Sequence, residues 1–189
     1  MTTSFEMREV RKERGRCLSG ASGEFGEIEV LYPVDLGPTG GTGAQVQGGA
    51  IPTALLIGWS ISDNKPRLTG AQLRLGDDEV KTRRNRWAVR RKGRALRMTH
   101  HGIEYRCTAV SRKSYLFTRP GLAVTVTESG IRKKRHRLLV LIDGPAEPVD
   151  IALAVLFSGA NRSHLTMGGA FRAGFSTVCN LWADTTVRT

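Results

Sequence analysis

Residues 148–158, PVDIALAVLFS, constrain the fold more than any other part of the chain. As a helix this segment is apolar on every side, and such a helix must be enclosed by protein or by lipid. It falls well short of the ~20 residues that span a bilayer, so enclosure by protein is the better interpretation. Glu147, Pro148 and Asp150 suit its N-terminus, because proline fits the first turn and negative charge offsets the positive end of the dipole. Gly159 is expected to stop the helix in a left-handed conformation.

Most of the remaining chain has the pattern of short strands. Apolar and polar residues alternate in many segments, as at residues 103–107, and turn signals recur about every ten residues. This spacing is typical of an antiparallel meander, and we expect roughly ten to twelve strands. The first two strand signals, at 5–10 and 28–32, could pair as a hairpin, with Pro33 ending the second. One or two closing strands are expected at about 165–175.

A barrel closed around the apolar helix satisfies both features, because the strands lose their free edges and the helix loses contact with water. We therefore predict an all-β fold with one buried helix, an antiparallel meander closing into a barrel of about 10–12 strands around the helix near 148–158. A chain of 189 residues suits a single domain, 1–189. The glycine-rich run at about 37–49 is expected to be a flexible insertion. A sandwich or open barrel with the helix on one face is the alternative.

The glycine-rich run does not match a phosphate-binding loop. That loop needs a lysine followed by serine or threonine after its last glycine, and the run has no lysine. A nucleotide site there is therefore not expected.

The chain is strongly basic, with 29 Lys and Arg against 17 Asp and Glu, a formal charge of +12. This balance favours an anionic partner, either nucleic acid or a membrane surface. A GC-rich bacterial genome would also enrich arginine, so a compositional origin for part of the excess stays open. The candidate phosphate-binding residues fall in two clusters: Arg83, Arg84, Arg86, Arg90, Arg91, Lys92 and Arg94, and then Arg132, Lys133, Lys134 and Arg135. If the second cluster begins a strand that neighbours the first, the two form one positive face that binds phosphate groups. A solvated rim is the alternative.

Cysteine use and the N-terminal sequence favour a cytoplasmic protein. Cys17, Cys107 and Cys179 are far apart and odd in number, which argues against a disulfide framework. The first residues lack the features of a secretory signal, and no apolar stretch is long enough to span a membrane.

The sequence predicts no catalytic residue, no cofactor and no metal site. None of His100, His101, His136 and His164 has a partner at metal-ligand spacing, and His100 and His101 would point to opposite faces of a strand. Cys107 near these histidines could be a nucleophile only as an exposed thiolate, and an inert buried thiol is the preferred interpretation. We therefore expect a protein that is not an enzyme.

The order of basic strands, Gly-Pro turn and apolar helix resembles the tubby C-terminal-like superfamily, which includes LURP-one-related proteins and phospholipid scramblases. The resemblance is one of pattern, spans about residues 80–175, and is strongest at residues 87–97, 102–106 and 144–157. It implies a barrel threaded by the helix. It also implies phosphoinositide binding through basic residues on the barrel, a role that transfers to Arg90, Arg91, Lys92 and Arg94.

Together these features predict a non-enzymatic domain whose basic face binds anionic phosphate groups, with phospholipid headgroups as the preferred ligand. The protein would then be cytoplasmic and peripheral to the inner face of the membrane. Two alternatives stay open: a nucleic-acid-binding protein that uses the same surface, and a structural or assembly protein of a bacterial or phage particle. A protein partner also stays open.

Overall fold

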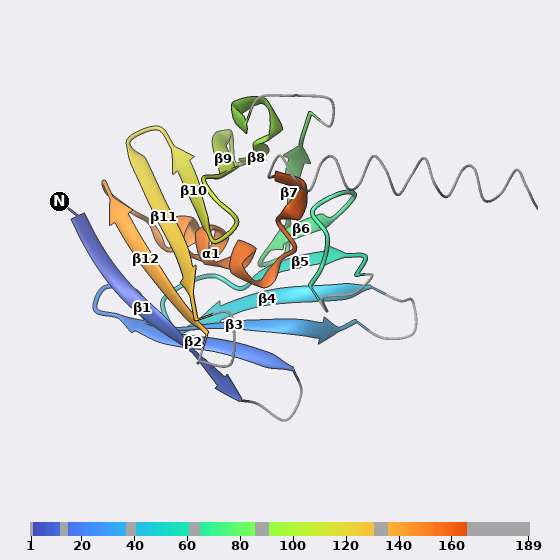
Figure 1. Ribbon diagram of the computed structural model, residues 1–189. Coiled ribbons are helices and arrows are strands. Elements are labelled where there is room, and N and C mark those ends of the chain that lie inside the picture. Colours follow the sequence, from blue (N-terminus) through green and yellow to red (C-terminus); the bar gives the residue numbers. More distant parts are fainter. Residues whose placement is uncertain are drawn as a thin grey trace, which may run out of the picture.

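The computed structural model describes residues 2–11, 15–36, 41–60, 65–85, 91–130 and 136–165. The strands in these ranges form one closed antiparallel barrel, in which each strand pairs with its sequence neighbours and the last pairs with the first (Figure 1). The predicted barrel of ten to twelve strands is therefore confirmed. The strands are β1 (Thr2–Arg11), β2 (Arg16–Ser22), β3 (Gly26–Asp35), β4 (Thr42–Gly48), β5 (Ala54–Gly58), β6 (Gln72–Leu75), β7 (Asp78–Arg83), β8 (Leu96–His100), β9 (Ile103–Ala109), β10 (Ser114–Arg119), β11 (Leu122–Ser129) and β12 (Arg137–Asp143).

Alternation of apolar and polar residues determines which side chains enter the barrel. In β11, Leu122, Val124 and Val126 are buried, while Ala123, Thr125 and Thr127, which alternate with them, are partly exposed. Successive side chains of a strand point to opposite faces, so the apolar set lines the interior. The inward side chains of the barrel pack with the helix into one hydrophobic core.

The apolar helix fills the barrel. Helix α1 (Pro148–Leu156) lies inside the barrel (Figure 1) and packs against β4, β5 and β11. All its residues from Asp150 to Leu156 are buried. Each fully buried Leu, Ile or Val side chain contributes about 1.5–3 kcal/mol. Among the described residues, no helix is long and apolar enough to cross a membrane.

The end of the helix differs from the prediction. α1 tightens into a 3-10 turn, η2 (Phe157–Gly159), and Gly159 does not have the positive φ expected of a left-handed stop. Glycine is needed there for space, because a Cβ on Gly159 would lie 2.8 Å from the Cβ of Ala44. A second 3-10 turn, η3 (Ser163–Leu165), follows.

Hydrogen bonds at two positions hold the helix in place. Near its start, the carboxylate of Asp150 accepts hydrogen bonds from Nε and Nη2 of Arg119, both at 2.8 Å, and from the backbone N–H of Glu147 at 2.7 Å. Further along, the buried hydroxyl of Tyr115 donates to the carbonyl of Ala154 at 2.7 Å. The prediction that Asp150 is a charge at the helix N-terminus is confirmed.

The expected hairpin between residues 5–10 and 28–32 is wrong. β2 lies between β1 and β3 and pairs with both. β2 has a turn-like composition, but Gly20 within it meets β1 closely, since a Cβ there would lie 2.4 Å from the carbonyl oxygen of Glu6. β3 also runs past Pro33, because its register on β4 shifts between Leu31 and Val34.

The flexible insertion predicted at 37–49 is also wrong where the structure describes it. Residues 42–48 form β4, which pairs with β3 and β5 and points Ala44 and Val46 into the core. Residues 37–40 lie outside the described residues. The closing strands expected at about 165–175 lie outside them too, apart from Leu165 in η3, and the barrel closes without them.

The barrel has two distinct ends. Because every strand is antiparallel to the next, the short turns after β6, β8 and β10 share one end with the start of α1, which we call the helix-start end. The connections after β5, β7 and β11 share the other, which we call the long-loop end. α1 begins just after β12 and runs toward the long-loop end, where Asn161 pairs with Arg67.

Candidate functional site

Three arginines lie side by side on the outer surface of β7, β8 and β9. The strand register places Arg83 directly opposite Arg97, and Arg97 directly opposite Arg106. Arg83 and Arg97 are exposed, and Arg106 is half-buried. Directly opposed residues have Cβ atoms about 4.5–5.5 Å apart, and like charges in such positions destabilise a sheet. We call Arg83, Arg97 and Arg106 the arginine row.

The arginine row has little acidic compensation. Glu104 Oε1 lies 3.5 Å from Arg97 Nη1 and 4.0 Å from Arg106 Nη2. Within the described ranges, no ion pair involves Arg83. Arg97 and Arg106 therefore share one carboxylate and Arg83 pairs with none in the described ranges, which leaves an excess of positive charge on this surface.

Arginines on β1, β2 and β12 have more acidic compensation, although Arg8 also lies directly opposite Arg137 in the strand register. Glu6 Oε1 lies 3.5 Å from Arg8 Nε and 3.4 Å from Arg137 Nη1, and Glu9 Oε1 lies 3.8 Å from Arg16 Nε. These three arginines have two carboxylates among them, so they provide a matched comparison for the arginine row.

A hollow of about 320 Å³ adjoins the arginine row at the long-loop end. It is lined by Leu68, Thr69, Gly70, Thr82, Arg83, Arg84 and Leu96. Arg84 Nη2 donates to the hydroxyl of Thr69 at 3.1 Å, which orients the guanidinium beside the hollow. Guanidinium and hydroxyl donors together suit the oxygens of a phosphate group.

The predicted site residues are only partly brought together. Arg83 and Arg84 line the hollow, whereas Arg94, at the end of the 3-10 turn η1 (Arg91–Arg94), is only 5% exposed. That burial differs from the exposed position expected, and among the described residues Nε and Nη2 of Arg94 have no hydrogen-bond partner. The remaining candidates lie outside the described residues, or have side chains outside them: Arg86, Arg90, Arg91, Lys92, Arg132, Lys133, Lys134 and Arg135.

The two predicted basic clusters do not flank neighbouring strands. The first follows β7 and the second follows β11, and β9 and β10 lie between the strand pairs β7–β8 and β11–β12. Both connections nevertheless leave the barrel at the long-loop end, since both follow odd-numbered strands. The expectation of adjacent strands is wrong, but both connections start from the end that holds the hollow.

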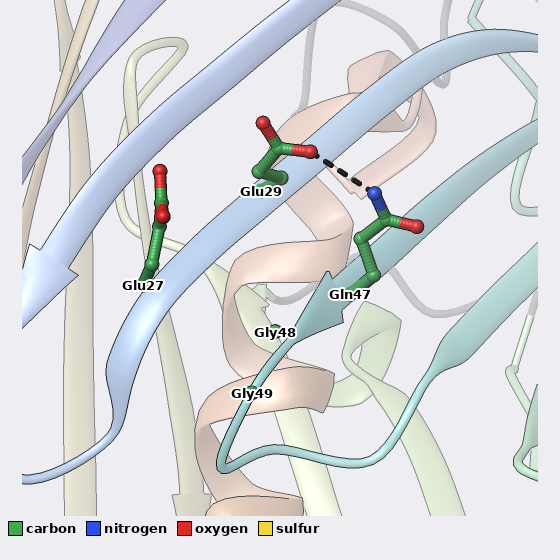
Figure 2. Close-up of a pocket in the computed structure, with 5 residues that line it drawn as sticks. All are labelled: Glu27, Glu29, Gln47, Gly48 and Gly49. Atoms are coloured by element: carbon green, nitrogen blue, oxygen red, sulfur yellow. Dashed lines mark hydrogen bonds between the residues drawn. The ribbon is translucent and has the colours of Figure 1, made fainter.

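A second hollow, of about 440 Å³, lies on the outside of β3 and β4 and is acidic. Glu27 and Glu29 from β3 and Gln47, Gly48 and Gly49 line it, and Gln47 Nε2 donates to Glu29 Oε2 at 3.0 Å (Figure 2). Two carboxylates repel a phosphate group, so this hollow is not a phosphate site.

A buried charge cluster closes the core near the end of the helix. Arg162 donates to Glu128 Oε1, and His136 Nε2 lies 3.4 Å from Glu128 Oε2. Burial alone would raise the pKa of Glu128, but the hydrogen bond with His136 and the nearby charges of Arg162 and Lys65 lower it to about 2. The charged groups of Glu128, Arg162 and His136 pair with one another, so the cluster stabilises the fold and is not a candidate binding site.

The thiol of Cys107 is fully buried, as predicted. Burial raises its pKa to about 12, so the nucleophilic thiolate is disfavoured. Cys17 is buried as well, and Cys179 lies outside the described residues.

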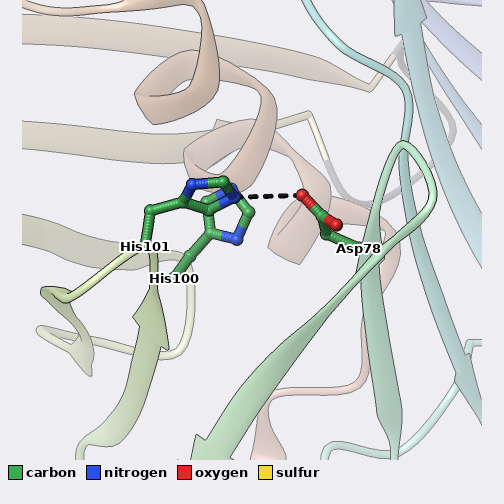
Figure 3. Close-up of side chains that lie close together, drawn as sticks. All are labelled: Asp78, His100 and His101. Atoms are coloured by element: carbon green, nitrogen blue, oxygen red, sulfur yellow. Dashed lines mark hydrogen bonds and ion pairs between the residues drawn. The ribbon is translucent and has the colours of Figure 1, made fainter.

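The histidine pair differs from the prediction. His100 ends β8 and His101 begins the following turn, so the two side chains lie together, with ring centroids 4.0 Å apart, rather than on opposite faces (Figure 3). Asp78 lies beside them, in hydrogen-bond contact with His101. Sequence patterns do not indicate this cluster, because Asp78 lies more than twenty positions before the two histidines.

Comparison of the chain with protein-family models, with curated proteins and with solved structures finds no match.

Proposed function

We propose that this chain is a non-enzymatic binding domain whose arginine row and adjoining hollow bind phospholipid headgroups at a membrane surface. The observation that supports this most is the register of β7, β8 and β9, which aligns Arg83, Arg97 and Arg106 across three strands. Neighbouring arginines with too few carboxylates can bind an anion from outside the chain. A phosphate group suits them, because each guanidinium offers two parallel donors to a pair of phosphate oxygens.

The hollow extends the row toward the long-loop end. Arg83 belongs to both, and Arg84 and the hydroxyls of Thr69 and Thr82 add further donors. A headgroup phosphate seated there would also contact the apolar side chains of Leu68 and Leu96. This mixture of charged and apolar lining suits a lipid at the boundary between headgroup and acyl chain better than a fully hydrated polyanion.

An exposed tryptophan favours a membrane over nucleic acid. Trp59 directly follows β5 at the long-loop end and is 71% exposed. Its carbonyl accepts a hydrogen bond from the backbone N–H of Arg67 at 2.9 Å, next to the segment that lines the hollow. Tryptophan is enriched where a membrane meets water, because its ring is apolar and its N–H is polar.

The resemblance to the tubby C-terminal-like superfamily supports the same proposal. A barrel closed around an apolar helix is the architecture that the resemblance implies, and the described strands have that arrangement. The phosphate-binding surface proposed here lies on the barrel, as basic residues do in that superfamily.

The test is vesicle co-sedimentation of the full chain at physiological salt. Phosphatidylcholine vesicles would be compared with vesicles that also contain phosphatidylserine or phosphoinositide. The variant Arg83→Gln/Arg97→Gln/Arg106→Gln removes the row, and Arg8→Gln/Arg16→Gln/Arg137→Gln removes the same charge elsewhere. With about 1 kcal/mol for each basic residue near an anionic surface, the first variant should lose about a hundredfold in affinity. The control should lose much less.

Duplex DNA and single-stranded RNA are tested in parallel. If they bind with a steep salt dependence while anionic vesicles do not, the nucleic-acid alternative replaces the membrane proposal. If neither ligand binds, or if both variants lose affinity equally, the arginine row is not a binding site. Sedimentation velocity then tests the assembly alternative through concentration-dependent oligomers.

A further inference from the structure

Two tight turns lie next to each other at the helix-start end. The first joins β6 to β7 through Gly76 and Asp77, and Asp78 begins β7 immediately after it. The second joins β8 to β9 through His101 and Gly102. Because β7 pairs with β8, these turns are neighbours although they are distant in sequence.

Three potential metal ligands converge between the turns. His101 Nε2 lies 3.0 Å from Asp78 Oδ2, and one donor atom from each of Asp78, His100 and His101 lies within 4.8 Å of the other two. Figure 3 shows the imidazoles of His100, at the end of β8, and His101, in the following turn, near the carboxylate of Asp78. Among the described residues, this is the one group of three His, Cys, Asp or Glu side chains with such spacing.

The backbone explains how His101 reaches this position. His101 has φ of +48° and Gly102 has φ of +78°, and His101 is the one described residue other than glycine with positive φ. Two successive residues with positive φ make a type I′ turn, in which the first position favours Asn, Asp or Gly. Histidine in that position is less favourable for the turn itself, and it points the imidazole back toward Asp78 and His100.

We propose that Asp78, His100 and His101 form a binding site for a divalent transition metal such as zinc. Imidazole nitrogen and carboxylate oxygen are ligands that zinc prefers, at about 2.0–2.2 Å. In a tetrahedral site these bond lengths place neighbouring donors about 3.3 Å apart. The pair His101–Asp78 is already close to that spacing, and exposed side chains can adjust to bring in His100.

Three protein ligands leave the fourth tetrahedral position for a water molecule. The metal would also link the β6–β7 turn to the β8–β9 turn. The metal would replace the direct contact between His101 and Asp78 with a bond to each, and add His100. A ligand that binds only the folded state stabilises it, so the metal should raise the thermal midpoint of unfolding. The site lies at the other end of β7 from Arg83 and the hollow, so it is independent of the proposed phosphate site.

The experiment is a calorimetric titration of the chelator-treated full chain with zinc chloride. We expect one zinc per chain, and a loss of affinity of at least about tenfold in each of Asp78→Asn, His100→Gln and His101→Asn. Asparagine at position 101 suits the left-handed turn, so this variant removes the imidazole without disturbing the hairpin. Asp77→Asn is the matched control, because it removes a carboxylate from the adjoining turn and should leave the affinity unchanged.

Cobalt substitution gives an independent readout of ligand type. Cobalt bound by imidazole and carboxylate shows d–d absorption without the intense near-ultraviolet band of a thiolate ligand. A thiolate band, or zinc affinity that survives in Asp78→Asn, His100→Gln and His101→Asn, would place the metal elsewhere and overturn the proposal. Absence of zinc binding in the folded wild-type chain would overturn it as well.

Discussion

Replacement of Arg119 by methionine tests how the helix is held inside the barrel. The carboxylate of Asp150 is only 1% exposed, and its two short contacts with Arg119 are both 2.8 Å. In Arg119→Met, the one other donor to Asp150 among the residues that the structure describes is the N–H of Glu147. A buried charge left without its partner costs about 3–5 kcal/mol, and we expect a loss of that size in the free energy of unfolding.

The reciprocal change should cost less. In Asp150→Asn, Arg119 Nη2 still reaches the carbonyl of Pro145 at 3.2 Å, and Nη1 reaches that of Pro120 at 3.3 Å. Its side chain is also more accessible than that of Asp150, at 13% exposure. We expect a loss of about 1–3 kcal/mol. The double variant should lose less than the sum of the two, because it leaves no buried charge unpaired.

Guanidinium chloride unfolding followed by far-ultraviolet circular dichroism measures the free energy of unfolding of the wild-type chain, the two single variants and the double variant. Arg112→Met is the control, because Arg112 is exposed and its loss should fall within about 0.5 kcal/mol. The ion pair does not anchor the helix if Arg119→Met lowers the free energy of unfolding by less than about 1 kcal/mol. The same conclusion follows if the loss in the double variant equals the sum of the losses in the two single variants. The hydrophobic packing of α1 would then be sufficient by itself.

Three further predictions concern other parts of the chain. Glu128 has a pKa of about 2 in the folded protein against an ordinary value of 4.5, so its stabilisation is present above pH 4.5 and is lost as the pH falls toward 2. Glu128→Gln should remove that part of the acid dependence in unfolding titrations, and an unchanged pH profile would contradict it. Gly159→Ala should lower the free energy of unfolding, measured by thermal unfolding, by about 1–3 kcal/mol, because the new Cβ would lie 2.8 Å from that of Ala44. Arg97→Thr should raise the free energy of unfolding by about 0.5 kcal/mol, because it removes two like-charge cross-strand oppositions, yet weaken binding to anionic vesicles.

The helix and the barrel could be predicted because they depend on patterns along the chain. An apolar helix too short to span a membrane must be buried by protein, and strands in which apolar and polar residues alternate can bury it with their apolar faces. β2 and β4 were missed because their glycines suggest turns. Gly20 and Gly48 are instead required by neighbouring strands, since a Cβ at these positions would lie 2.4 and 2.5 Å from backbone oxygens of Glu6 and Glu27.

The candidate sites were harder to predict because they depend on strand register. Arg83 belongs to a basic cluster and was predicted, but Arg97 and Arg106 were not. Each lies on a different strand, and only pairing makes them neighbours. The same holds for Asp78 and His101, which a two-residue turn and one strand pairing bring within 3.0 Å.

The arginine row is difficult to explain by folding alone. Two successive like-charge oppositions each destabilise the sheet by roughly 0.2–1 kcal/mol, and any neutral residue at the middle position would relieve both. Arg8 also lies opposite Arg137 between β1 and β12, but there Glu6 pairs with both arginines, and Glu9 pairs with Arg16 on β2. On β7–β9, Glu104 pairs with Arg97 and Arg106 but not with Arg83. An anion bound from outside would supply the missing negative charge, which is why the phosphate proposal rests on this surface rather than on the net charge of the chain.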